Sequence, residues 1–146
     1  IVMVGLSKNQ LKQLPKNILG ITRTDNVQEL AEIYSSADVF FNPTLEEVMG
    51  LTNVEAQACG APVITFNTGG SVETIDDTTG FIVEKGDLEE AIKKIRKIES
   101  EGKEEYSESC IRRANKYYNK NDKFQEYIEL YKDILEEVTY GKRLFN

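Results

Sequence analysis

The sequence has few of the residue types from which many catalytic and metal sites are built. Its 146 residues include no histidine and only two cysteines, Cys59 and Cys110, which do not form a CxxC pair. Disulfide-stabilised folds, cysteine–histidine zinc sites and Ser–His or Cys–His catalysis therefore lack the residues that they need. So few cysteines also favour a reducing compartment.

Long apolar segments and an excess of positive charge are missing as well. No apolar run approaches the roughly 20 residues that span a bilayer, and the first residues show no signal-peptide pattern. The formal charge is −7, with 25 acidic and 18 basic side chains, which argues against nucleic acid as a partner. With 40% hydrophobic residues, the composition predicts one soluble globular domain in the cytoplasm.

Short apolar segments alternate with helical patterns along most of the chain. Strands are predicted at Ile1–Leu6, Asn17–Thr22, Asp38–Phe41, Pro62–Phe66 and Thr79–Val83. Helices are predicted at 26–36, 52–59, 87–98 and 107–138, the last of them broken at 119–122. This order predicts a Rossmann-like α/β fold, a mostly parallel sheet with helices on both faces.

Two helix starts and two apolar faces stand out in this pattern. Asn26 with Glu29, and Asp87 with Glu90, have the spacing of a capping box. The helix after Asp87 is expected to bury one face, formed by Leu88, Ala91, Ile92, Ile95 and Ile98. The last helix carries an apolar stripe that we expect to dock on the core: Phe124, Tyr127, Ile128, Tyr131, Ile134, Leu135 and Val138.

The segment that follows the strand ending at Phe41 is placed where parallel sheets bind ligands, beyond the carboxyl ends of their strands. A helix start near Gly50 presents free N–H groups, which favour phosphate or sugar oxygens. Glu47 in the loop and Glu55 in the helix are eight positions apart and can face the same crevice. An ionised carboxylate accepts hydrogen bonds, and the paired hydroxyl groups of a sugar can donate them.

Each of these features also has a purely structural interpretation. Glu47 taken alone is an ordinary solvated loop acid, and Glu55 alone is an acid favoured by the helix dipole. Gly60 is expected to be a helix cap, and the Asp76–Asp77 pair a turn and not a metal site. Cys59 is expected to be a small buried residue. It is the order of the whole segment that favours function for the two glutamates.

That order resembles a known family. The segments Glu47–Ala56, Cys59–Ile64 and Gly69–Glu73 are similar to the donor-binding signature of the group 1 (family 4) retaining glycosyltransferases, in which a Glu is followed after seven residues by a second Glu. The resemblance extends from Ile1 to about Val83. It implies the C-terminal, nucleotide-sugar-binding half of a GT-B fold, a role in polysaccharide biosynthesis, and no metal or cofactor.

The resemblance also implies roles for single residues. Glu55 is expected to hold the ribose hydroxyls and Glu47 to contact a hydroxyl of the transferred sugar, as the catalytic residue. Thr22 and Arg23, at the end of the second strand, are expected beside the base. Backbone N–H groups that are expected to contact sugar and diphosphate oxygens belong to Met49, Gly50, Leu51 and Thr52. The donor is expected to be a UDP- or GDP-linked hexose.

The resemblance further implies that residues 1–146 are a piece of a larger enzyme. In the family, an acceptor-binding N-terminal domain and the start of the donor domain, with an Arg and a Lys that neutralise the diphosphate, precede the equivalent of Ile1. The fragment alone is expected to be inactive. A glycan or lipid-linked acceptor would then bind the other domain, in the cytoplasm or at the inner face of the membrane.

Two functions from other classes are compatible with parts of the pattern. A glycoside hydrolase would use Glu47 and Glu55 as an acid–base pair and would need one raised pKa. A non-catalytic nucleotide- or protein-binding module, such as a receiver-like domain, would need an aspartate cluster at its strand ends. The predicted strand ends carry Asn42 and Asn67 instead.

Overall fold

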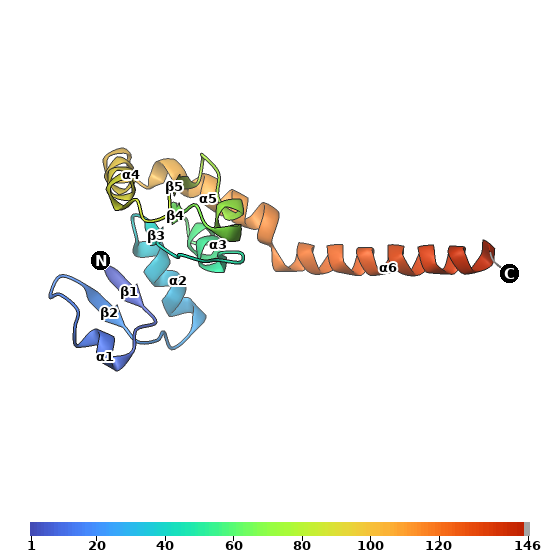
Figure 1. Ribbon diagram of the computed structural model, residues 1–146, viewed down its shortest axis with the longest axis horizontal. Helices are drawn as coiled ribbons and strands as arrows, with labels where there is room; N and C mark the ends of the chain where they lie inside the picture. The colour runs from blue at the N-terminus through green and yellow to red at the C-terminus, as the bar shows by residue number, and fades with distance from the viewer. Residues whose placement is uncertain (145–146) are drawn as a thin grey trace.

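The computed structural model describes residues 1–144, with side chains up to residue 138, so the last two residues of the predicted domain lie outside it. The predicted strands and long helices occur in the predicted order (Figure 1), and a short helix at Lys8–Leu11, which was not predicted, lies between the first two strands. Their order is β1 (Val2–Val4), α1 (Lys8–Leu11), β2 (Leu19–Ile21), α2 (Val27–Ser36), β3 (Phe40–Asn42), α3 (Leu51–Ala58), β4 (Val63–Phe66), the 3-10 helix η1 (Gly69–Thr74), β5 (Gly80–Val83), α4 (Leu88–Glu101), α5 (Glu104–Tyr118) and α6 (Lys120–Leu144).

All strand pairs are parallel, but the strands form two sheets. In the larger sheet β4 lies between β3 and β5, so that Ile64 pairs with Phe41 on one side and with Phe81 on the other. In the smaller sheet β1 pairs with β2, and Met3 lies opposite Gly20. The α/β class is confirmed, whereas the single sheet that we expected is divided between β2 and β3.

The larger sheet carries helices on both faces, because side chains of β4 alternate between two apolar clusters. Ile64 and Phe66 pack in one cluster with residues of α4 and α5, namely Ala91, Ile98, Tyr106 and Cys110. Val63 packs in the other with Tyr34 of α2 and Ala56 of α3. The sheet is therefore a rigid middle layer, and β3 and β4 deliver the following loops to one edge of it.

Both predicted helix starts are confirmed. The side chain of Asn26 accepts a hydrogen bond from the Glu29 N–H, and that of Asp87 accepts one from the Glu90 N–H, each at 2.9 Å. The carboxylate of Glu29 accepts a hydrogen bond from the N–H of Asp25 at 2.6 Å, one residue before the N-cap residue Asn26. Gly60, with φ at +79°, ends α3 as expected.

Some expected burial is absent. The apolar run Ile1–Leu6 has the pattern of a buried strand, yet Val2, Met3 and Val4 are 40–47% exposed. The smaller sheet has its own apolar cover instead, because leucine side chains from the segment between its strands pack over Gly20. On α4, Ala91 and Ile98 are buried as predicted, but Leu88 and Ile92 are 56% and 49% exposed. Only the part of the stripe that faces β4 and β5 is covered.

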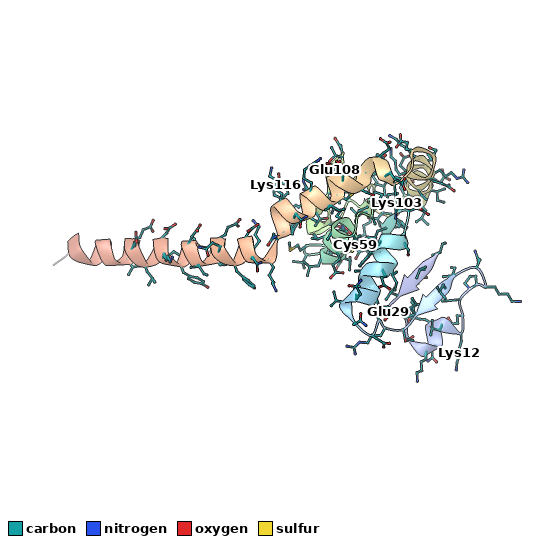
Figure 2. All side chains as sticks on the ribbon, turned by 180° about the vertical axis from the view of Figure 1, so that it is seen from behind. Lys12, Glu29, Cys59, Lys103, Glu108 and Lys116 are labelled. Carbon is teal, nitrogen blue, oxygen red and sulfur yellow. The ribbon has the colours of Figure 1, made fainter. Side chains whose placement is uncertain are left out.

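The chain ends in a long helix that does not dock. The predicted break lies at Asn119, between α5 and α6, but α6 extends away from the sheet (Figure 1), and its side chains project around it (Figure 2). Every member of its apolar stripe from Phe124 to Val138 is 46–66% exposed. The expectation that this stripe docks on the core of the domain is wrong.

We expect Ile98→Ala to lower the free energy of unfolding by about 2–5 kcal/mol, because it empties a fully buried position between α4 and the sheet. Ile92→Ala, on the same helix, is the matched control and should change stability by no more than about 0.5 kcal/mol. Urea denaturation followed by circular dichroism measures both. Equal losses in the two variants would contradict the burial described for α4.

Candidate functional site

The loop between β3 and α3 is the candidate site, and it ends on an uncapped helix start. Gly50 is the N-cap residue of α3, with φ at +71°, and offers no side chain to the helix. The Asn53 N–H bonds to the Gly50 carbonyl at 2.9 Å. The N–H groups of Leu51 and Thr52 thus have no side-chain cap within α3, which leaves them for an acceptor from outside the helix.

The carboxylate of Glu47 lies on the backbone N–H groups of its own loop. One of its oxygens accepts from Val48 at 2.9 Å and from Met49 at 3.4 Å. Hydrogen bonds from the N–H groups of Gly50, Met49 and Val48 hold the pKa of the Glu47 carboxyl below its ordinary value. Two of the four donors that we expected to face a ligand, the N–H groups of Met49 and Gly50, therefore point at an anionic group, and that group is the carboxylate of Glu47.

The backbone at the start of η1 packs directly against this loop. The Gly70 N–H donates to the Glu47 carbonyl at 3.2 Å. A Cβ on Gly69 would overlap the Glu47 carbonyl, and a Cβ on Gly70 would overlap that of Val48. Gly69 also has φ at +45°. The two glycines are therefore required for the close approach that sets the conformation of the loop.

Buried polar side chains under the loop fix the start of α3. The amide of Asn53 donates to the hydroxyls of Ser71, at 2.9 Å, and Thr74, at 3.0 Å. Its carbonyl oxygen accepts from Asn42 at the end of β3, at 2.9 Å. Thr65 of β4 and Ser71 share a 2.6 Å bond. Asn53 of α3 thus joins β3 to η1, and Ser71 extends the network to β4, although the sequence motif gave Asn53 no role.

Glu55 lies on α3, one turn beyond the loop, and its side chain is exposed. The hydroxyl of Tyr34 in α2 donates to one of its carboxylate oxygens at 3.2 Å. Cys59 follows one turn later and is half-buried, not fully buried as expected. Burial, above all, raises the pKa of its thiol, so the thiol stays neutral. The side chains of Glu47 and Glu55 are both accessible. Backbone N–H groups hold the carboxylate of Glu47, whereas the Tyr34 hydroxyl holds that of Glu55.

Thr22 and Arg23 are not in contact with Glu47 or Glu55 through any of the hydrogen bonds or ion pairs among the described residues. Both are exposed in the loop after β2, which belongs to the smaller sheet. Within the described residues, no hydrogen bond or ion pair joins either of them to the loop before α3 or to Glu55. The expectation that they lie beside the base of a nucleotide stays a prediction.

An arginine outside the sequence motifs holds the C-terminal end of η1. Arg113 of α5 donates to the carbonyls of Thr74 at 3.0 Å and Glu73 at 2.9 Å, and pairs with Asp76 at 2.7 Å. Burial acts to raise the Asp76 pKa, but bonds from Thr78 and Arg113 bring it below its ordinary value. Asp76 forms the predicted turn. Arg113 is half-buried, and no motif in the sequence predicts these contacts of a helical arginine.

A shallow hollow of about 220 Å³ lies beside this clamp, away from the predicted site residues, none of which lines it. Its walls are Asp76, Thr78, Ser109, Arg112, Arg113, Lys116 and Tyr117. Across residues 1–144 there is no cluster of three or more histidine, cysteine or acidic side chains that suits a metal ion. Over the same residues, every helix is too short or too polar to cross a bilayer.

Comparison with known proteins places these features in a family. The family profile described as "Glycosyl transferases group 1" matches residues 2–117. The capsular polysaccharide biosynthesis glycosyltransferase CapM of Staphylococcus aureus is 42% identical over 74 residues. That match takes in 50% of this chain and 20% of CapM. The chain thus spans about a fifth of the length of this curated relative.

Two solved structures have the same fold. Sucrose-phosphate synthase from Thermosynechococcus elongatus superposes on 93% of this chain and 38% of its own, with a TM-score of 0.78 and 24% identity. HepE of Anabaena, solved in complex with UDP, superposes on 80% of this chain and 32% of its own, with a TM-score of 0.68 and 23% identity. At these identities the likeness shows the fold alone.

We expect Gly69→Ala to destabilise the protein more than Gly86→Ala, although both glycines have positive φ. A Cβ on Gly86 meets nothing within 4 Å, so the control should lose only the about 1–2 kcal/mol of a left-handed residue. The overlap with Glu47 should cost about 1–3 kcal/mol more, as overpacking does. Urea denaturation gives both values. Equal losses of stability would show that the loop shifts to accommodate the added methyl group at no extra cost.

Proposed function

Because the chain belongs to the group 1 glycosyl transferases, we propose that it is the donor-binding domain of an enzyme that transfers a hexose from a UDP- or GDP-linked donor. The acceptor is a glycan or a lipid-linked sugar, the anomeric configuration is retained, and no metal is used. The observation that carries the proposal is the loop before α3, whose N–H groups converge on an anionic group.

In this proposal a donor oxygen takes the place that the Glu47 carboxylate occupies. The N–H groups of Met49 and Gly50, which now face that carboxylate, bind sugar or diphosphate oxygens together with the uncapped N–H groups of Leu51 and Thr52. The Glu47 side chain turns from its own loop to a hydroxyl of the transferred hexose. An ionised Glu47 suits this role, because an acceptor-only carboxylate fixes a hydroxyl donor.

The chemistry asked of this domain is positioning and stabilisation of charge. As the bond between the sugar and the diphosphate breaks, its electron pair moves to the diphosphate oxygen. The acceptor hydroxyl oxygen forms the new bond to the same carbon, and the hydroxyl proton passes to the leaving diphosphate. Fixed N–H dipoles stabilise the growing negative charge without reorganising. We propose that the further cations and the acceptor site belong to parts of the enzyme beyond this chain, which spans a fifth of CapM.

The competing functions have less support. A hydrolase needs one carboxylic acid held protonated near neutral pH by a raised pKa. Hydrogen bonds from the loop lower the pKa of Glu47, the opposite of what a general acid requires. A receiver-like module needs carboxylates at the strand ends, whereas β3 ends on Asn42, whose side chain is committed to Asn53.

The first test is Glu55→Ala. A nucleoside diphosphate should bind about tenfold or more weakly, because the ribose loses a charged acceptor worth about 1.5–3 kcal/mol. Isothermal titration of the 146-residue chain with UDP and with GDP measures the effect. Glu99→Ala, on the outer surface of α4, is the control and should leave binding as it was. An unchanged affinity in Glu55→Ala would remove Glu55 from the site.

The second test is Glu47→Ala in the complete enzyme. Turnover should fall by about tenfold or more while donor affinity changes less, because the lost bond of about 1.5–3 kcal/mol is to the transferred sugar. Glu46→Ala is the control, since the neighbouring Glu46 side chain is exposed and forms no hydrogen bond within residues 1–138. Steady-state kinetics with a labelled nucleotide sugar give both constants, and parental kinetics in Glu47→Ala would refute its role.

A further inference from the structure

Tyr34 is a buried tyrosine that no step of the proposed function has used. It lies in the last turns of α2 and is 9% exposed. Its ring meets the ring of Phe40 edge-on, with centroids 5.4 Å apart, and packs in the cluster that contains Ala56 and Val63. The ring is therefore fixed by the core, and its hydroxyl has one defined position at the edge of α3.

The end of α2 that carries Tyr34 is held from a third element. Lys103, at the start of α5, donates to the carbonyl of Ser35 at 2.6 Å and to that of Ala37 at 3.2 Å. Figure 2 shows Lys103 beside this end of α2. Because both carbonyls lie within three residues after Tyr34, at the end of α2, the backbone beside Tyr34 is held as well as its ring.

The phenol supports a carboxylate that is otherwise free to move. Glu55 is exposed, and an exposed glutamate samples many rotamers, which a ligand must freeze at an entropic cost. The bond from the Tyr34 hydroxyl to Glu55 Oε2, 3.2 Å long, limits that freedom. Burial, followed by the charge of Glu55, raises the pKa of Tyr34, so the hydroxyl keeps its proton and remains a donor.

The same bond leaves room for a ligand. A carboxylate has about four acceptor positions, of which Tyr34 fills one, and the phenolic oxygen can itself accept a hydrogen bond. Cys59, the other titratable neighbour of Glu55, keeps a neutral thiol and adds no charge. The pair of Tyr34 and Glu55 thus presents acceptors in a fixed arrangement to two adjacent hydroxyl groups.

We propose that Tyr34 is the positioning residue for Glu55 and that the pair of side chains selects a ribonucleotide over a 2′-deoxyribonucleotide. The inference rests on the proposed function, because it takes Glu55 as the group that binds the ribose hydroxyls. Tyr34 acts through Glu55: it holds the carboxylate in the orientation in which both ribose hydroxyls can donate to it at once. Preorganisation of this kind appears as affinity and selectivity and not as fold stability.

The test compares UDP with 2′-deoxy-UDP by isothermal titration of the 146-residue chain. Tyr34→Phe keeps the ring and removes the hydroxyl, and it should weaken UDP binding about three- to tenfold, the range for one hydrogen bond. Binding of 2′-deoxy-UDP should stay within twofold of the parent, so the ratio between the two affinities falls. The matched control is Tyr106→Phe, which removes a Tyr–Glu bond to Glu101 on the other face of the sheet. It should leave both affinities unchanged.

Further variants separate the inference from the function on which it rests. If Glu55→Ala weakens UDP binding but Tyr34→Phe leaves the ratio unchanged, or lowers both affinities equally, the role of Tyr34 is overturned and the proposed function stands. If Glu55→Ala has no effect, or the parent chain binds neither nucleotide, both fall. The double variant should bind UDP no more weakly than Glu55→Ala, and additive losses would also refute action through Glu55.

Discussion

The site depends on the contact between two backbones, where Gly69 and Gly70 lie against the carbonyls of Glu47 and Val48. No side chain larger than hydrogen fits there, so the start of η1 acts as a flat support for the loop before α3. With the carbonyls of the loop turned toward η1, its N–H groups face outward and converge on the Glu47 carboxylate. The anion-binding geometry of the loop therefore follows from the steric constraint at Gly69 and Gly70, which α3 and β4 separate from the loop in the chain.

Beneath the loop, polar side chains occupy a position that an apolar core would otherwise fill. Asn42, Asn53, Thr65 and Ser71 bond to one another at 2.6–2.9 Å, and all are buried. Apolar side chains of similar size would pack equally well in several arrangements, whereas directional bonds permit one. The network thus fixes where α3 begins relative to β3 and β4, and with it the position of the uncapped helix start.

The two motif glutamates are supported in different ways, which suits different tasks. The Glu47 carboxylate accepts hydrogen bonds from the N–H groups of its own loop, and in the proposed function a donor oxygen replaces it there. Glu55 is held by Tyr34, a side chain anchored in the core and on a helix tied to α5 through Lys103. In the function that we propose, Glu47 contacts the transferred sugar and has to move with it, whereas Glu55 binds the ribose and benefits from a fixed position.

The sequence by itself determined the α/β class, the helix caps at Asn26 and Asp87, and the location of the candidate loop, because these depend on local spacing and on motif order. It did not determine the division into two sheets, the exposure of Val2–Val4 or the undocked stripe of α6, since periodicity records that a face is apolar and not what covers it. The roles of Tyr34, Asn53 and Arg113 also came only from the tertiary structure. Each acts on a residue between 18 and 39 positions away, through contacts that folding alone brings together.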